Sequence, residues 1–271
     1  MVRPVAASVA GNGTFPSSIS RWHGDCKKEF GKIAKTTMKT LALELILSHL
    51  NEAHGELARL FARLQFIVFG EVVDESVKGW AETVAQAERI SPLDERALFV
   101  ALARAYRQLN VAWNGRHESV ERVRRDDPAD ITRWSRFPED AVFRDLWPAP
   151  SRCRGTPREP GRGHIAPSSL QAAFLQMAVR KLGILRYVVS FALGGNAAKV
   201  PRPKGLRSGM ETEPFTEEEF GRRMHRIYSE MNFAWAYRKR THGERLSRRT
   251  IRQYGRFSGV FLTAIVPSAV P

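Results

Sequence analysis

Three residues whose side chains can bind a ligand or fill a core recur in this chain at one helical spacing. Tyr106, Asn110 and Trp113 occupy positions i, i+4 and i+7, so on an α-helix they project from one face. Asparagine is a poor mid-helix residue because its amide competes for backbone groups, so its position predicts a specific hydrogen bond. Either a buried asparagine anchors the segment after the helix while the two rings fill the core, or the three side chains line a ligand pocket.

The triad returns 122 positions later as Tyr228, Asn232 and Trp235. Residues 92–113 (PLDERALFVALARAYRQLNVAW) and 214–235 (PFTEEEFGRRMHRIYSEMNFAW) align without a gap. Seven of the 22 aligned residues are identical, and most of the other pairs keep their chemistry. The alignment predicts a degenerate tandem duplication, and we interpret the residues that the two copies share as mainly structural.

The likeness continues past the helix, where arginines and a Glu-Arg pair recur. In the structural interpretation, bidentate arginine–carboxylate pairs tie this tail to the long helix. In the functional interpretation, the planar forks of the arginines collect a phosphate or a carboxylate. The aligned residues are Arg116 with Arg238, Glu121-Arg122-Val123 with Glu244-Arg245-Leu246, and Arg136-Phe137 with Arg256-Phe257.

The two tails differ in charge. Residues 116–136 hold six arginines and five acidic residues, whereas residues 238–256 hold eight basic residues and a single acid, Glu244. Since the same scaffold tolerates near-neutrality in the first copy, the basic excess of the second is not needed for folding. The residues predicted to contact phosphate are Arg238, Lys239, Arg240, Arg248, Arg249 and Arg252.

The charge of the whole chain follows the same division. Its formal net charge is +15, but residues 1–150 carry 21 Lys and Arg against 20 Asp and Glu, while residues 151–271 carry 22 against 8. Such a balance predicts a polyanionic partner, with DNA or RNA first and an anionic membrane surface or an acidic protein second. The alternative is that the arginines only decorate a solvated surface.

Hydrophobic periodicity predicts an all-α fold, since strands have little support in the sequence. Apolar residues at three- and four-residue spacing predict helix over 36–73, either as two helices or as one kinked at Gly55. Further helices are expected over 76–90 and 94–113, from Ser168 onward and from Thr216 onward. Asp94 is a natural N-cap, and Ser168 and Thr216 begin capping-box patterns.

These elements predict two helical units joined by a linker rich in Pro, Gly and Arg. We expect a poorly ordered lead over residues 1–35, a first unit over 36–147, a linker over 148–167 and a basic second unit over 168–271. Whether the two units are separate domains or share one core stays open at this level.

Catalytic and metal-binding patterns are weak. The spacing His23-x-x-Cys26 has only Cys153 to supply a further sulfur, and Glu71 with Glu75 lacks an accompanying Glu-x-x-His pair. The chain holds no HExxH motif, no phosphate-binding loop and no GxSxG elbow. No cofactor or metal is therefore expected, and an enzyme that uses the triads on a small anionic substrate is the least favoured hypothesis.

The remaining sequence features predict a cytoplasmic protein. Two cysteines are too few for a disulfide framework, the N-terminal apolar stretch is short, and no span reaches the roughly 18 to 20 apolar residues of a membrane helix. The leading hypothesis is a non-enzymatic helical protein that binds nucleic acid through backbone phosphates. A scaffold that docks an acidic protein is the alternative.

Overall fold

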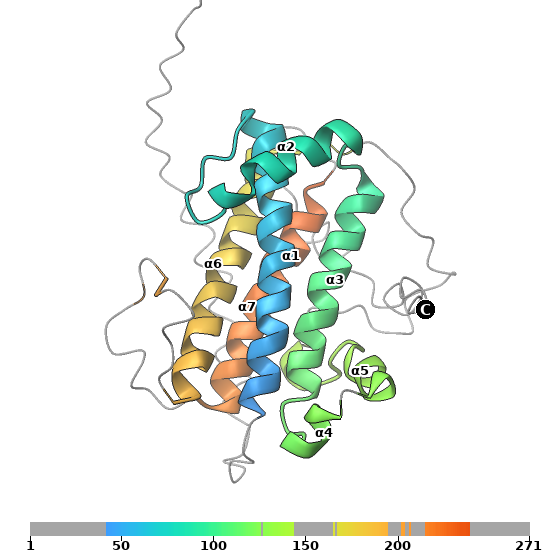
Figure 1. Cartoon of the computed structure of the whole chain (residues 1–271), viewed down its shortest axis with the longest axis vertical. Coiled ribbons are helices and arrows are strands. Elements are labelled where there is room, and N and C mark those ends of the chain that lie inside the picture. Colours follow the sequence, from blue (N-terminus) through green and yellow to red (C-terminus); the bar gives the residue numbers. More distant parts are fainter. Residues whose placement is uncertain are drawn as a thin grey trace, which may run out of the picture. The chain divides into compact units, whose positions relative to one another are not determined.

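In the structure, a computed structural model, all regular secondary structure of the described residues is helical (Figure 1). These residues are 42–125, 127–143, 165, 167–194, 202–203, 206 and 215–238, and none of them lies in a β-strand. The all-α prediction is therefore confirmed for this part of the chain.

Four long helices form an antiparallel bundle. They are α1 (Leu43–Phe69), α3 (Glu95–Asn114), α6 (Ser169–Ala192) and α7 (Glu217–Ala236). In Figure 1, α1 lies between α3 and α6, and it packs against both; α7 completes the bundle by packing on α6 and α3. Each helix is thus adjacent to two others.

Contacts between helix ends fix the directions of the four helices. The Ala42 amide donates to the Arg116 carbonyl at 2.8 Å, which places the start of α1 at the end of α3. On the other side of α1, Asn51 contacts Arg186 near the end of α6. The Gln171 side chain at the start of α6 donates to the Ala234 carbonyl near the end of α7. Every pair of neighbours in the bundle is therefore antiparallel.

The predicted N-caps are present where the helices begin. The side chains of Asp94, Ser168 and Thr216 accept hydrogen bonds from the amides of the third residue of their helices, Ala97, Gln171 and Glu219. Such a bond satisfies one of the amides that a helix leaves free, and it is worth about 1 kcal/mol. At the other end of α1, Gly70 closes the helix in the left-handed conformation with a φ of 79°.

The break considered at Gly55 does not occur, since α1 is one continuous helix of 27 residues. Its buried positions, among them Ile46, Leu50 and Leu57, are packed between α3 and α6, and this packing outweighs the cost of one glycine, about 1 kcal/mol. The shorter elements are η4 (Lys78–Trp80), α2 (Ala81–Ile90), α4 (Val120–Arg124), α5 (Pro128–Trp134) and η5 (Ala141–Phe143).

One hydrophobic core joins all four long helices. It contains Leu57 of α1, Leu102 of α3, Leu182 of α6 and Met231 of α7, each fully buried. Burying one such side chain contributes roughly 1.5–3 kcal/mol. The packing of the α1–α3 pair on the α6–α7 pair is therefore a major part of the free energy of folding. Helices from both predicted units thus contribute to the same core. No described helix is long and apolar enough to span a bilayer.

Candidate functional site

The two tyrosines of the repeated triads meet at the centre of the bundle. Tyr106 of α3 and Tyr228 of α7 stack with ring centroids 5.4 Å apart and an angle of 6° between the planes. The Tyr106 hydroxyl donates to Oδ1 of Asn232 at 2.7 Å, and the Tyr228 hydroxyl donates to Oδ1 of Asn110 at 2.7 Å. The triads are therefore joined across the α3–α7 seam by two equivalent bonds.

Burial keeps both hydroxyls protonated. Each tyrosine is fully buried, and this burial raises its phenol pKa well above the usual value; for Tyr228 the charge that Tyr106 would carry adds to the effect. A protonated phenol donates a hydrogen bond, whereas a phenolate can only accept one. The two hydroxyls therefore act as fixed donors and not as acids or nucleophiles at neutral pH.

The Asn110 side chain also holds the segment that follows α5. Its Nδ2 donates to the Ser135 carbonyl at 2.9 Å, and the neighbouring Asn114 donates to the carbonyls of Trp134 and Arg136, both at 2.7 Å. This is the role that the structural interpretation assigned to the asparagine. The pocket interpretation required open triads, but all six triad side chains are buried, with no residue more than 7 % exposed.

The segment held by Asn110 covers one half of the seam. Phe143 of η5 is fully buried and meets Trp113 at 5.0 Å and Tyr228 at 5.4 Å, both edge to face. Phe137 packs edge to face on Tyr106 at 5.6 Å. Edge-to-face contacts of this kind add about 0.5–1.5 kcal/mol to the burial of each ring. The site is thus a closed aromatic cluster.

At each end of the α3–α7 seam, an arginine stacks on the tryptophan ring of its own helix. The guanidinium carbon of Arg116 lies 3.9 Å from the ring centroid of Trp113, and that of Arg238 lies 3.8 Å from the ring of Trp235. Each arginine also donates to the backbone carbonyl of its own tryptophan, at 2.8 and 2.9 Å. Such cation–π stacking contributes about 1–2 kcal/mol when it is partly shielded from water.

Each arginine then crosses to the first residue of the opposite helix. Nε of Arg116 donates to Glu217 at the start of α7, and Nε of Arg238 donates to Glu95 at the start of α3, both at 2.8 Å. Burial acts to raise the pKa of Glu217, but the hydrogen bond and charge of Arg116, with a smaller contribution from His117, hold it below the usual value. The Glu217 carboxylate is therefore an ionised partner of Arg116.

Sequence analysis missed these two carboxylates as partners. Glu95 and Glu217 are one of the seven identical pairs of the alignment, but a glutamate in the first turn of a helix has a sufficient local reason, the helix dipole. The sequence signal for their role was that both aligned positions hold glutamate. Only the antiparallel packing of α3 on α7 shows that they reach the arginines of the other helix.

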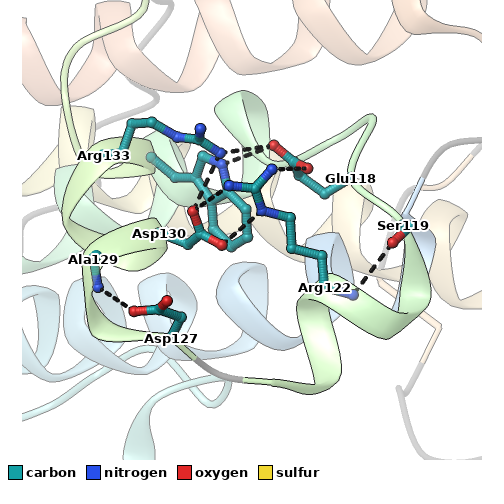
Figure 2. A network of polar contacts seen from close by, with 8 residues as sticks. Glu118, Ser119, Arg122, Asp127, Ala129, Asp130 and Arg133 are labelled. Atoms are coloured by element: carbon teal, nitrogen blue, oxygen red, sulfur yellow. Dashed lines mark hydrogen bonds and ion pairs between the residues drawn. The ribbon is translucent and has the colours of Figure 1, made fainter.

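Two arginines of the first tail, Arg122 and Arg133, form the network shown in Figure 2. Arg122 of α4 holds Asp130 of α5 with two parallel bonds, Nε to Oδ2 at 2.7 Å and Nη2 to Oδ1 at 2.6 Å. Arg133 contacts Glu118 at 3.0 Å and Asp130 at 3.4 Å, and Glu118 also accepts from the Trp134 indole at 3.1 Å. The hydrogen bond from Arg122 lowers the pKa of Asp130.

The structure gives the carboxylate partners that the sequence left open. A structural network was expected among Arg116, the Glu121-Arg122 pair and Arg136. Arg122 pairs with Asp130 and Glu118, Arg116 pairs with Glu217 of α7, and the Arg136 carbonyl accepts a bond from Asn114. The spacing of the arginines was informative, but the identity of their carboxylates depends on the turn between α4 and α5.

Of the six residues predicted to contact phosphate, the structure describes Arg238 alone. Its side chain is 17 % exposed and is engaged by Glu95 and by the Trp235 ring. The others, Lys239, Arg240, Arg248, Arg249 and Arg252, lie outside the described residues. Their contact with phosphate stays a prediction.

A buried ion pair between α6 and α7 had no signal in the sequence. Lys181 contacts Oε1 of Glu230, whose side chain is 5 % exposed and whose other oxygen has no hydrogen-bond partner. Burial raises the pKa of Glu230, against the opposing charge of Lys181. No group of three or more His, Cys, Asp or Glu side chains gathers among the described residues as a metal site would require.

Comparison with known protein families, with curated protein sequences and with solved structures gives no match for this chain.

Proposed function

We propose that the chain is a tandem duplication whose second copy binds nucleic acid through backbone phosphates, without catalysis and with little reading of base sequence. The duplication is supported by contacts in which aligned residues do the same thing. Tyr106 with Asn232 mirrors Tyr228 with Asn110, and Arg116 with Glu217 mirrors Arg238 with Glu95. Unrelated segments have no reason to share such a set.

The proposed binding function rests on a difference between the two tails: carboxylates neutralise the arginines of the first tail and are missing from the second. In the first copy, Asp130 and Glu118 hold the guanidinium groups of Arg122 and Arg133. In the aligned second tail, Thr250 takes the place of Asp130, and Glu244 is the one acidic residue between 238 and 256. The second tail thus keeps Arg245 in the place of Arg122, has Gln253 in the place of Arg133, and loses the carboxylates that neutralise the first tail.

Such a surplus favours a polyanion with regularly spaced charges. A guanidinium fork matches the geometry of a phosphate with two parallel bonds, and each phosphate that is contacted releases condensed counterions. Contacts of this kind position the protein on the backbone but do not distinguish bases. The proposal therefore predicts affinity for DNA and RNA of any sequence, with a strong dependence on salt.

The test is fluorescence anisotropy with a labelled 20-nucleotide RNA and a 20-base-pair DNA, measured from low to physiological salt. The logarithm of the affinity is expected to fall linearly with the logarithm of the salt concentration. The variant R248E/R249E/R252E should flatten that slope by about 2 to 3 units, because each lost phosphate contact removes roughly 0.9.

The matched control reverses three arginines of the first half, Arg89, Arg104 and Arg125, which are exposed. R89E/R104E/R125E changes the net charge by the same amount and should leave the slope almost unchanged. Equal losses in the two variants would show a response to net charge alone and would contradict the proposed site. An intact protein that binds neither probe would overturn the proposed nucleic-acid binding. A preference for a polyglutamate competitor would also overturn it and would favour an acidic protein partner.

A further inference from the structure

Three polar side chains gather where α1 packs on α6. Asn51 and His54 lie one turn apart on α1, and Arg186 lies in the last third of α6. Nε of Arg186 donates to Oδ1 of Asn51 at 2.7 Å. The His54 ring faces α6 as well, because a Cβ at Gly183, one turn before Arg186, would lie 3.7 Å from its Nε2. We call Asn51, His54 and Arg186 the α1–α6 polar cluster.

The α1–α6 polar cluster holds a positive charge without a carboxylate. Among the described residues, no Asp or Glu pairs with Arg186, whereas the half-buried Arg63, Arg116 and Arg238 each contact a glutamate. Burial lowers the pKa of Arg186. Burial, followed by the charge of Arg186, also lowers the pKa of His54 to about 4. Both shifts have the sign expected of a cluster that lacks a negative charge.

The cluster keeps hydrogen-bond donors that no described residue uses. The bond to Asn51 takes Nε of Arg186, so both Nη groups of the guanidinium stay available. The same bond takes Oδ1 of Asn51, which leaves its Nδ2 as a further donor, and the neutral His54 ring supplies one N–H. Solvent reaches these groups, since Asn51 is exposed and a Cβ at the adjoining Gly55 would meet no atom within 4 Å.

The other copy of the proposed duplication has no such cluster. At an offset of 121, Leu64-Gln65-Phe66 aligns with Leu185-Arg186-Tyr187, and Asn51 and His54 align with Ala172 and Leu175. These two aligned residues are buried and apolar, and Gln65 accepts a bond from the Asp74 amide at 3.2 Å. Apolar side chains therefore suffice at these positions of a helix in this bundle, and the polar ones of the cluster call for another reason.

We propose that the α1–α6 polar cluster binds the phosphate group of a ligand. The two free Nη groups of Arg186 match two phosphate oxygens, and Asn51 and His54 supply donors for the others. A carboxylate has only two oxygens, so a phosphate uses this set of donors more fully. The phosphate belongs either to a small compound or to a nucleic-acid backbone. The contacts that form the cluster depend neither on the basic tail of the second copy nor on its binding to nucleic acid.

The His54 ring is the reporter for the first experiment. The full-length chain is labelled with ¹³C/¹⁵N-histidine, and the ring signal that is missing from His54→Gln identifies His54. Inorganic phosphate is added at pH 7, with sodium chloride keeping the ionic strength constant. The His54 signal should shift and saturate with phosphate, because the anion docks beside the ring, and it should not respond to chloride alone.

Two arginines of α6 provide the variant and its matched control. Arg186→Gln removes the guanidinium of the cluster and should raise the Kd for phosphate at least about tenfold. Arg180→Gln makes the same change of net charge at an exposed position of α6 and should leave the Kd within about twofold. The absence of a saturable His54 shift in the wild type, or equal losses in the two variants, would overturn the proposal.

Asn51→Asp covers the case in which Arg186→Gln fails to fold. It sets a carboxylate where Oδ1 of Asn51 already accepts from Arg186, so the new side chain pairs with the guanidinium in place of a ligand. Circular dichroism should show a folded protein, and the phosphate response of the His54 ring should be lost. Phosphate affinity equal to that of the wild type in this folded variant would contradict the site.

The same signal distinguishes the two sources of phosphate. A 20-nucleotide RNA replaces inorganic phosphate in a second titration of the wild type. A His54 shift that saturates at a lower concentration of phosphate groups than inorganic phosphate requires would assign the site to a nucleic-acid backbone. A His54 signal that responds to inorganic phosphate but not to RNA would assign it to a small phosphate compound. If neither titrant moves the signal, the cluster binds no phosphate and the proposal is wrong.

Discussion

Tyr106 and Tyr228 stack almost in parallel, and each donates a hydrogen bond to the asparagine that lies four residues after the other tyrosine. The four side chains are buried, so each hydroxyl is the donor that satisfies a buried amide oxygen. The cluster that looked like a candidate binding site in sequence is thereby a connector of α3 and α7. Its properties can be tested by stability measurements.

Removing one hydroxyl should destabilise the bundle more than its single bond suggests. Tyr106→Phe leaves Oδ1 of Asn232 without this donor in a buried position, so we expect a loss of about 1–3 kcal/mol in the free energy of unfolding. Urea denaturation followed by circular dichroism measures it. Tyr187→Phe, at a half-buried position of α6, is the control and should change stability by less than Tyr106→Phe does. Equal effects of the two variants would contradict the role of the Tyr106–Asn232 bond.

Two glycines in helices should respond oppositely to alanine. A Cβ at Gly221 would lie 2.9 Å from Cη2 of the buried Trp113 ring, so Gly221→Ala should cost about 1–3 kcal/mol through overpacking, less the gain in helix propensity. A Cβ at Gly55 would meet no atom within 4 Å, so Gly55→Ala should stabilise α1 by about 0.5–1 kcal/mol. Thermal unfolding of both variants gives the comparison, and stabilisation by Gly221→Ala would show that Trp113 does not pack there.

The two Arg–Glu bonds should differ in their contribution to stability although they have the same length. The Glu95 side chain is 8 % exposed, whereas that of Glu217 is 43 % exposed, and Arg116 has Asp140 at 3.4 Å as a further carboxylate. Glu95→Gln should therefore cost about 2 kcal/mol or more, and Glu217→Gln less than about 1 kcal/mol. Chemical denaturation at low and high salt distinguishes them. A larger loss for Glu217→Gln would reverse this assignment.

His54 of α1 should make the stability of the protein depend on pH. Burial, with a smaller contribution from the charge of Arg186, lowers its pKa from 6.5 to about 4. Between these values the unfolded chain binds a proton that the folded chain does not, so stability is full above pH 6.5 and falls as the pH drops towards 4. The full shift corresponds to roughly 3 kcal/mol.

The comparison of wild type with His54→Gln isolates this contribution. Between pH 7 and pH 4.5, the denaturant midpoint should fall less for the variant than for the wild type. An NMR titration of the His54 ring in the folded protein provides the direct check, since a midpoint near 6.5 would rule out the lowered pKa.

The main helices of this fold could be predicted because their signals are local. The periodic apolar residues of α3 and α7 and the caps Asp94, Ser168 and Thr216 depend on neighbours within one turn, and the structure confirms them. The continuity of α1 through Gly55 could not be predicted in this way. It depends on the packing of α3 and α6 on either side, which no local pattern contains.

The partners within the site were beyond the sequence for the same reason. The helical spacing of Tyr106 and Asn110 indicated that they share a face, but it did not show that each bonds to a residue of the other helix. Likewise, Arg122 was expected to belong to a network, yet the choice of Asp130 depends on the turn that brings α5 beside α4 (Figure 2). Residue types were predictable, and pairings across elements were not.

The crossed bonds also determine how this chain can diverge over evolutionary time. A substitution at Tyr106 removes the partner of Asn232, and one at Tyr228 removes the partner of Asn110, so selection acts on pairs that stand far apart in the chain. Relatives of this protein should therefore show coevolution between positions 106 and 232, and between 110 and 228.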